Sequence, residues 1–160
     1  MAEALRAAPV LEVSQLKSAV GQVFTSPWFQ VDREHCAKFA ESSFLDLVYT
    51  DPAVNERYQD GLVEGFYIVS LMDALRSCAY RDHPSHHGIN YGSNRLRFIQ
   101  PVTYSDVLRL ECLIAEVSER ANGELVEVEC RLMAQGHERP SVVYSLMYLL
   151  LPAEKVLTVL

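Results

Sequence analysis

Two glycines precede a long apolar helical pattern, and this arrangement can bind negative charge. Gly61 and Gly65 open the stretch, and from Phe66 to Ala79 the apolar residues recur at helical spacing. The first N–H groups of a helix have no partner within the helix. The sequence therefore predicts a site for an anion, or for an oxyanion that forms during a reaction, where this helix begins.

Histidine and cysteine, which often bind metals, are present but not at ligand spacing. His83, His86 and His87 lie together in a polar stretch, with no cysteine or carboxylate in register. The cysteines lie far apart in apolar surroundings, at positions Cys36, Cys78, Cys112 and Cys130. We therefore expect no metal and no cofactor, and we interpret the cysteines as buried, reduced thiols.

Length and charge restrict the class of protein. A chain of 160 residues suits one domain, and we expect residues 1–160 to form it, with residues 1–10 as a loose segment. The net charge of -7, without a cluster of Lys or Arg, argues against a nucleic-acid partner. The first residues, with Glu3 and no apolar run, do not resemble a secretory signal. Together with reduced cysteines, this predicts a cytoplasmic protein.

Helices are expected in the first half of the chain and strands in the second. Helices are expected over 11–23, 33–40 (with Asp32 as its cap) and 66–79. Loops are expected over 41–61 and 81–88. Strands are expected over 28–31, 89–98, 107–118, 125–133 and 141–151, with a hairpin turn at 121–124.

The helix over 66–79 is apolar around most of its circumference, so we expect it inside the protein. Only four polar side chains need to face water: Ser70, Asp73, Arg76 and Ser77. The helix is too short to span a membrane. The order of elements predicts an α+β fold in which a curved antiparallel sheet wraps around this central helix. The last strand, over 141–151, is apolar on both faces, which indicates a dimer interface.

One stretch of the chain carries a specific family resemblance, namely Ile89-Asn90-Tyr91-Gly92-Ser93-Asn94-Arg95-Leu96-Arg97-Phe98-Ile99-Gln100-Pro101-Val102. In this stretch the sequence resembles the MaoC-like hotdog hydratase/dehydratase family, in particular its NodN-like branch. Other matches, within about Trp28 to Leu151, are the stretches 28–31 and 39–40, Asp51-Pro52, and Gly65 with the apolar helix after it. The resemblance implies a single hotdog fold, a homodimer, and thioesters of coenzyme A or an acyl carrier protein as substrates. The implied reaction is reversible addition of water to a 2-enoyl thioester.

The chain departs from this family in the loop that carries the catalytic pair. The family has an Asp, then Asn or Gln, then a His two residues before an Asp-Pro pair. Counting back from Asp51-Pro52, the His position holds Tyr49 and the Asp position holds Phe44 or a neighbour. The nearest carboxylate is Asp46, and the residue before the helix glycine, often His in the family, is Glu64. The usual Asp–His pair is therefore absent.

Asp46 and Tyr49 form the substitute pair that we consider. Hydration needs a group that activates water and a group that moves a proton beside the carbonyl. Tyrosine, with an ordinary pKa of about 10, is a poor base but a competent acid. Asp46 and Tyr49 face one cavity if this loop makes a helical turn. Dehydration, isomerisation or cyclisation then becomes feasible, with the N–H of Gly65 as oxyanion donor and Glu64 as a second possible base.

Each candidate also has a structural alternative. Tyr49 can simply fill the space of the missing His, Asp46 can cap a turn, and Glu64 can cap the helix. Gly65 can serve close helix packing alone. The strand residues that the resemblance suggests for substrate binding can be ordinary strand residues: Asn90, Tyr91, Asn94 and Arg97. An Arg there can also meet the phosphates or carboxylate of a ligand.

Three functions remain open from the sequence. The first is a thioester-processing hydratase or dehydratase with altered chemistry or a specialised, polyketide-like substrate. The second is a non-catalytic hotdog subunit that binds an acyl chain or supports an active partner, because the Asp–His pair is missing. The third is a hotdog thioesterase with Glu64 or Asp46 as base, which the signature over 89–102 disfavours. The acyl group and its carrier are not predicted.

Overall fold

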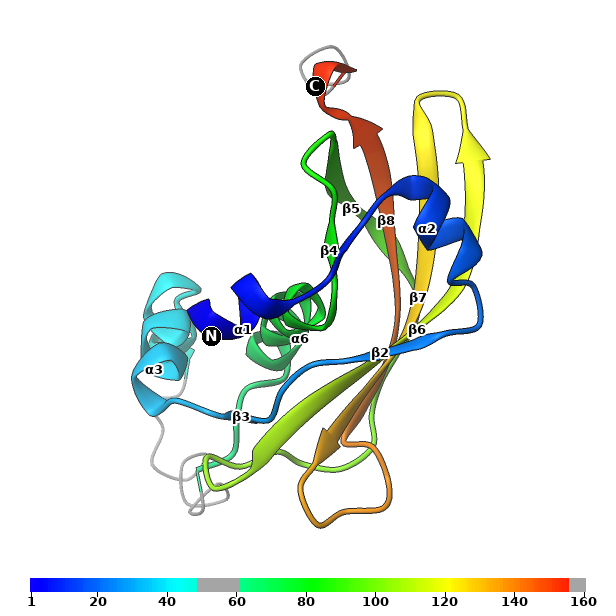
Figure 1. The fold of residues 1–160 in the computed structure, drawn as a ribbon. Helices are drawn as coiled ribbons and strands as arrows, with labels where there is room; N and C mark the ends of the chain where they lie inside the picture. The colour runs from blue at the N-terminus through cyan, green and yellow to red at the C-terminus, as the bar shows by residue number, and fades with distance from the viewer. Residues whose placement is uncertain (49–60, 156–160) are drawn as a thin grey trace.

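The computed structural model describes residues 1–48 and 61–155, and it is built around the helix α6 (Gly65–Ala79). A curved sheet lies along one side of α6, and the N-terminal helix α1 also lies against α6 (Figure 1). The other helices are α1 (Ala2–Ala7), α2 (Val13–Ser18), α3 (Arg33–Ser42), α4 (Leu45–Val48) and a final 3-10 turn (Ala153–Lys155). The strands are β1 (Val10–Leu11), β2 (Val23–Thr25), β3 (Phe29–Gln30), β4 (Arg81–Asp82), β5 (His86–Phe98), β6 (Val107–Arg120), β7 (Gly123–Ala134) and β8 (Val142–Pro152).

The main sheet is antiparallel throughout. Its strands follow the order β2-β6-β7-β8-β5, and β3 pairs with the other end of β6. The four long strands follow one another as β5 to β8 in the second half of the chain, as the sequence predicts. The predicted α+β fold, with a curved antiparallel sheet wrapped around a central helix, is therefore confirmed.

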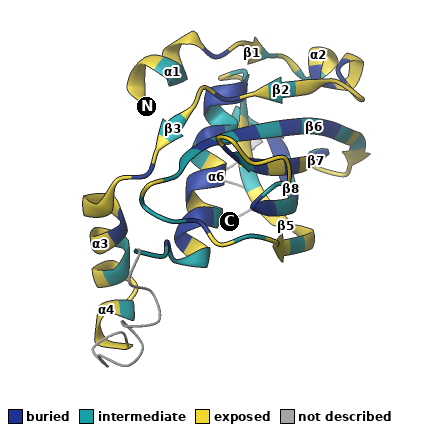
Figure 2. Cartoon of the chain, turned by 90° about the horizontal axis from the view of Figure 1, so that it is seen from below, coloured by how far each residue is buried: buried dark blue, intermediate teal, exposed yellow. Residues whose placement is uncertain are grey.

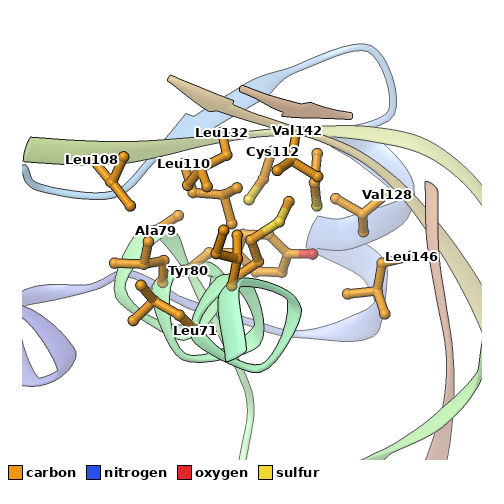
Figure 3. Packing of buried hydrophobic residues seen from close by; sticks show 14 of the residues in the cluster. Leu71, Ala79, Tyr80, Leu108, Leu110, Cys112, Val128, Leu132, Val142 and Leu146 are labelled. Carbon is orange, nitrogen blue, oxygen red and sulfur yellow. The ribbon is translucent and has the colours of Figure 1, made fainter. Parts of the chain in front are cut away.

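The hydrophobic core lies between α6 and the inner face of the sheet (Figure 3). Along β6 the buried residues alternate with partly exposed ones, so that Leu108, Leu110, Cys112 and Ile114 all point inward. They meet Leu71, Met72, Leu75 and Ala79 of the helix. All four cysteines are buried and form no disulfide, as expected. Among the described residues, no helix is long and apolar enough to cross a membrane.

The N-terminal segment, expected to be loose over residues 1–10, consists largely of a short helix and a short strand. Residues Ala2–Ala7 form α1, and Val10–Leu11 pairs in parallel with β4. The sulfur of Met1 lies 3.2 Å from the Cys78 sulfur of α6. Alanine-rich sequence has a high helix propensity, and contact with α6 supplies the packing that a short helix lacks on its own.

The polar stretch 81–88 is not a loop either. Its first two residues form β4, and His86 begins β5 by pairing with Pro152. The polar composition of this stretch predicts a loop. The strand β5 is polar as well, because it is an edge strand whose side chains face water along most of its length. The helix expected over 11–23 is limited to Val13–Ser18 (α2), and Val23 already belongs to β2.

Burial on α6 differs from the prediction at two positions. Arg76, expected to face water, has a side chain that is only 11% exposed and pairs with Asp82. Phe66, counted among the buried residues, is 66% exposed at the beginning of the helix. A sequence pattern predicts which face is apolar, but the partner of a charged side chain depends on the tertiary fold.

The last strand, β8, lies inside the sheet rather than at its edge. It pairs with β7 on one side and β5 on the other, so both of its backbone edges are occupied. Some of its side chains are buried in the core and the others are partly exposed, so the dimer expected from this strand stays a prediction. The exposed long strand is β5, and α3 and α4 are also largely exposed (Figure 2).

Candidate functional site at the start of the central helix

Glu64 fixes the point at which α6 begins. It is the N-cap residue, and its carboxylate Oε2 accepts a hydrogen bond of 2.8 Å from the backbone N–H of Tyr67. The Glu64 carbonyl accepts the first helical bond, from the N–H of Ile68. The N–H groups of Gly65 and Phe66 have no acceptor within residues 1–48 and 61–155. Two donors therefore remain available at the positive end of the helix.

The segment that leads into the helix is held by the chain beyond β5. The N–H of Val63 donates to the Val102 carbonyl at 2.8 Å, and the N–H of Tyr104 donates to the Gly61 carbonyl at 3.1 Å. Gly61 has a φ of 70°, which glycine adopts without strain. This two-sided attachment fixes where the two free donors point.

Gly65 allows a close approach of the Phe98 ring to the start of the helix. A Cβ at this position would lie 3.1 Å from Cζ of Phe98, at the end of β5. An Ala here would therefore require the ring to move by a few tenths of an ångström. The aromatic ring therefore lies directly against the start of the helix.

A cavity of about 320 Å³ opens beside these donors. Its lining is formed by Leu62, Val63, Gly65, Ile68, Phe98, Ile99, Gln100, Pro101 and Val102. No residue in this lining has a titratable side chain, and most of the wall is apolar. Such a cavity suits a hydrocarbon group whose polar end reaches the helix N–H groups.

Tyr67 and Cys36 lie close to the site but are unsuited to proton transfer near neutral pH. Burial, together with a smaller effect of the neighbouring Cys36, raises the pKa of Tyr67 to about 12. Burial likewise raises the pKa of the Cys36 thiol. The Phe39 ring of α3 packs edge-on against Tyr67, with 5.6 Å between ring centroids. Both groups therefore stay protonated and act as packing residues.

The candidate pair Asp46–Tyr49 lies partly outside the described residues. Asp46 is exposed on α4, and Tyr49, like Asp51-Pro52, belongs to the stretch 49–60 that the structure does not describe. Phe44 has a φ of 60° and turns the chain between α3 and α4. Within the expected loop 41–61 the structure has the end of α3 and the helical turn α4, which is the condition under which Asp46 and Tyr49 could face one cavity.

The four candidate binding residues on β5 do not come together. Asn90 faces inward and lines a small polar cavity of about 140 Å³ beside Arg76. Tyr91 and Asn94 are the extra residues at two irregularities in the pairing with β8. Asn94 donates to Glu127 on the outer face at 3.0 Å, and Arg97 is exposed on that face.

A buried polar cluster at the other end of α6 was missed from the sequence. Arg76 donates to Asp82 at 3.0 Å, Tyr148 donates to Asp82 at 3.1 Å, and the hydroxyls of Tyr80 and Tyr148 lie 3.2 Å apart. The Arg76 guanidinium also lies over both tyrosine rings. The sequence feature that could have indicated this pair is a basic and an acidic residue, Arg76 and Asp82, six positions apart on either side of the helix end. This cluster holds the C-terminal part of α6 against β8.

Metal binding finds no support in the described residues, where no group of three or more His, Cys, Asp or Glu could hold an ion. The side chain of His83 is hydrogen-bonded to the hydroxyl of Ser85, and its Nε2 lies 3.2 Å from Oε1 of Glu12. His86 is bonded to Ser85 as well. The histidines thus contribute to the contacts around β4 and the start of β5.

Comparison with known proteins adds two named relatives, although no family model matches the sequence. Nodulation protein N of Rhizobium meliloti is 27% identical over 130 residues, which cover 76% of this chain and 71% of the relative. The 3-hydroxyacyl-thioester dehydratase Z of Mycobacterium tuberculosis is 26% identical over 136 residues, which cover 82% of this chain and 90% of the relative.

Solved structures share the fold. The R-hydratase PhaJ1 of Pseudomonas aeruginosa superposes with a TM-score of 0.63 at 20% identity, over 88% of this chain and 84% of that one. A MaoC-like dehydratase from Rhodospirillum rubrum gives 0.62 at 16% identity, over 84% of this chain and 93% of that one. In sequence the chain is therefore similar to nodulation protein N and to the dehydratase, and in fold it is similar to MaoC-like hotdog proteins. The resemblance noted in the sequence and the expected hotdog fold are thereby confirmed.

The described residues place two features side by side. They are the N–H groups of Gly65 and Phe66, which have no acceptor among these residues, and the apolar wall of the cavity. The described residues supply no base in that wall, because the Glu64 carboxylate is engaged as the helix cap. A base would have to come from α4, from the stretch 49–60, or from a second copy of the chain.

Proposed function

We propose that this protein processes acyl thioesters of coenzyme A or an acyl carrier protein, as a hydratase or dehydratase. The observation that carries the proposal is the pair of free N–H groups at Gly65 and Phe66 beside an apolar cavity. The thioester carbonyl would accept these two N–H groups, and the acyl chain would lie along the apolar wall. Hydrogen bonds to the carbonyl oxygen stabilise the enolate-like charge that builds up on it during the reaction.

Relatives support this reaction class. One is named a 3-hydroxyacyl-thioester dehydratase and one neighbour in structure an R-hydratase. In hydration, a hydroxyl adds to C3 of the 2-enoyl group and a proton to C2; dehydration is the reverse. In our proposal Asp46 accepts the proton from water, and Tyr49 donates or removes the proton at C2. Glu64 is the second candidate for the base, and it would have to give up its hydrogen bond with the N–H of Tyr67 to act.

The replacement of the family's Asp–His pair leads us to propose altered chemistry or a specialised, polyketide-like substrate. A tyrosine in the position of the His favours reactions in which an acid assists, such as dehydration, isomerisation or cyclisation. Asn90, Tyr91, Asn94 and Arg97 remain candidates for contact with the substrate. Of these, only Asn90 lies on the inner face beside a cavity.

We also propose a cytoplasmic homodimer, with residues 1–160 as one domain. Support for the dimer is the edge strand β5, which among the described residues pairs only with β8 and carries the exposed side chain of Tyr91. Phe66, at the start of α6, is also exposed and apolar. A second copy that pairs along β5 would cover such side chains.

A non-catalytic role is the second candidate. It is favoured by one observation, the absence of any titratable side chain in the described lining of the cavity. In that case the protein would bind an acyl thioester, or support an active partner, without turning it over. The apolar wall and the two donors serve binding equally well.

The test is turnover of short and medium 2-enoyl thioesters, followed by the loss of enoyl absorbance. We expect the wild type to be active, and Asp46→Asn and Tyr49→Phe each to lower kcat by at least about 100-fold. Glu41→Gln, an exposed carboxylate on α3, is the matched control. An inactive wild type whose melting temperature still rises with a bound acyl thioester would favour the non-catalytic role. No activity and no thermal shift would refute the thioester function.

A further inference from the structure

Phe98 occupies an unusual place, against the two free donors at the start of α6. Its Cζ lies 3.1 Å, and its Cε1 3.2 Å, from where a Cβ of residue 65 would be. The absence of a side chain at residue 65 lets the ring approach the helix this closely. Anything that binds to the N–H of Gly65 therefore lies next to this ring.

Phe98 is also the only aromatic residue in the described lining of the cavity. The remaining wall consists of aliphatic side chains, glycine, proline and Gln100. A planar ring at one end of an aliphatic cavity takes up space that a hydrocarbon chain would otherwise fill. The ring thus sets how far the cavity extends beside the donors.

The backbone around Phe98 is held, whereas its side chain is half exposed. Phe98 pairs with Val142 of β8, and the next N–H, of Ile99, donates to the Ser141 carbonyl at 2.8 Å. The Phe98 side chain is 48% exposed, so solvent occupies one side of the ring. A fixed backbone with a half-exposed ring gives a definite wall that a substitution can remove without moving the strand.

We propose that Phe98 determines the size of the acyl group that the cavity accepts, and that the wild-type site selects short, unbranched acyl chains. This inference rests on the proposed function, because it assigns the acyl chain of the thioester to the cavity. Long or 2-branched chains meet the ring when the carbonyl reaches the N–H groups of Gly65 and Phe66. Removing the ring lengthens the cavity in the direction of solvent.

Binding can be separated from turnover with probes that the enzyme cannot convert. Suitable probes are thioether analogues of butyryl, octanoyl, dodecanoyl and 2-methylbutyryl thioesters, in which a ketone replaces the thioester group. They keep the carbonyl oxygen but have neither the 2-enoyl double bond nor the thioester bond between carbonyl carbon and sulfur. Each is offered on coenzyme A and on pantetheine, the segment that coenzyme A and a carrier protein share.

The experiment compares wild type, Phe98→Ala and Phe98→Leu by calorimetric titration. We expect the wild type to prefer the butyryl probe. The Phe98→Ala variant should shift the affinity ratio of dodecanoyl to butyryl by about tenfold or more towards the longer chain, because one methylene in an apolar pocket already gives such discrimination. The 2-methylbutyryl probe should gain affinity in the same variant. Phe98→Leu should give an intermediate ratio.

Trp28→Ala is the matched control, since Trp28 is likewise a half-exposed aromatic residue but stacks on Arg109 instead of lining the cavity. It should keep the wild-type ratio. The proposal is overturned if the wild type binds the series and Phe98→Ala keeps the same chain-length ratio. If the wild type binds none of the probes on either carrier, the proposed function itself fails, which is a different result.

Discussion

At the scale of single residues, Glu64 combines a candidate catalytic group with a structural task. Its carboxylate caps α6 through the N–H of Tyr67. We predict that Glu64→Ala lowers the free energy of unfolding by about 1 kcal/mol, the usual cost of losing an N-cap. Glu64→Gln, which keeps an acceptor oxygen, should lose less. Urea denaturation of the three proteins measures the difference, and equal losses in both variants would argue against the cap.

Tyr67 gives a prediction about alkaline pH. Its pKa is raised to about 12 in the folded state, mainly by burial, whereas an unfolded tyrosine titrates near about 10. Above the unfolded value the folded protein holds more protons than the unfolded chain, so stability falls as the pH rises from about 10 to about 12. Tyr67→Phe should flatten this decline. Urea midpoints across that pH range test it, and an unchanged slope would contradict the assignment.

At the scale of elements, the Arg76–Asp82 pair joins the end of α6 to β4. Both side chains are nearly buried, at 11% and 10% exposure. We predict that Asp82→Asn lowers the free energy of unfolding by about 3–5 kcal/mol, because it leaves the charge of Arg76 buried and unpaired. A double-mutant cycle with Arg76→Met should show strong coupling between the two positions, and additive losses would contradict it.

The exposed pair Lys38–Glu34 on α3 is the matched control for this prediction. Its atoms are 2.6 Å apart, closer than in the buried pair, but both side chains are largely in water. Glu34→Gln should therefore cost less than about 1 kcal/mol. A comparable loss in both variants would mean that burial is not what makes the Arg76–Asp82 pair important.

The elements themselves were largely predictable, and the failures have a common physical cause. Helix α6 and strands β6 to β8 carry strong periodic patterns over ten or more residues, and they were found with small errors at their ends. The helix α1 and the strand β4 are short, and contacts with α6 and β1 stabilise them rather than their own sequence. Tertiary contacts of this kind leave no local pattern.

The candidate site was predictable to a smaller degree. The free N–H groups before the apolar helix follow from the glycine at 65 and general helix geometry. The roles of Phe98 and Val102 in its cavity do not, because these residues are more than thirty positions away and reach the site through the curvature of the sheet. Arg76 and Asp82 are only six positions apart, but their pairing was missed because the burial of both side chains depends on the tertiary fold.

At the scale of the whole molecule, the two edges of the sheet differ. One edge is divided between the short strands β2 and β3, whereas the other is the single long strand β5. A long unpaired edge is the usual place for another strand to add. If the protein is a homodimer, β5 is therefore the edge at which we expect the two copies to meet.

We predict that Tyr91→Glu weakens this dimer by at least about tenfold in Kd. Tyr91 is 61% exposed on β5, and a two-fold axis along this edge would bring the two introduced carboxylates near each other, which is unfavourable. Val23→Glu, at an exposed apolar residue of the opposite edge, should leave the dimer intact. Light scattering during gel filtration gives the mass against the 18.1 kDa of one chain. Dissociation by Val23→Glu alone would move the interface to the β2 edge, and a monomeric wild type would refute the dimer.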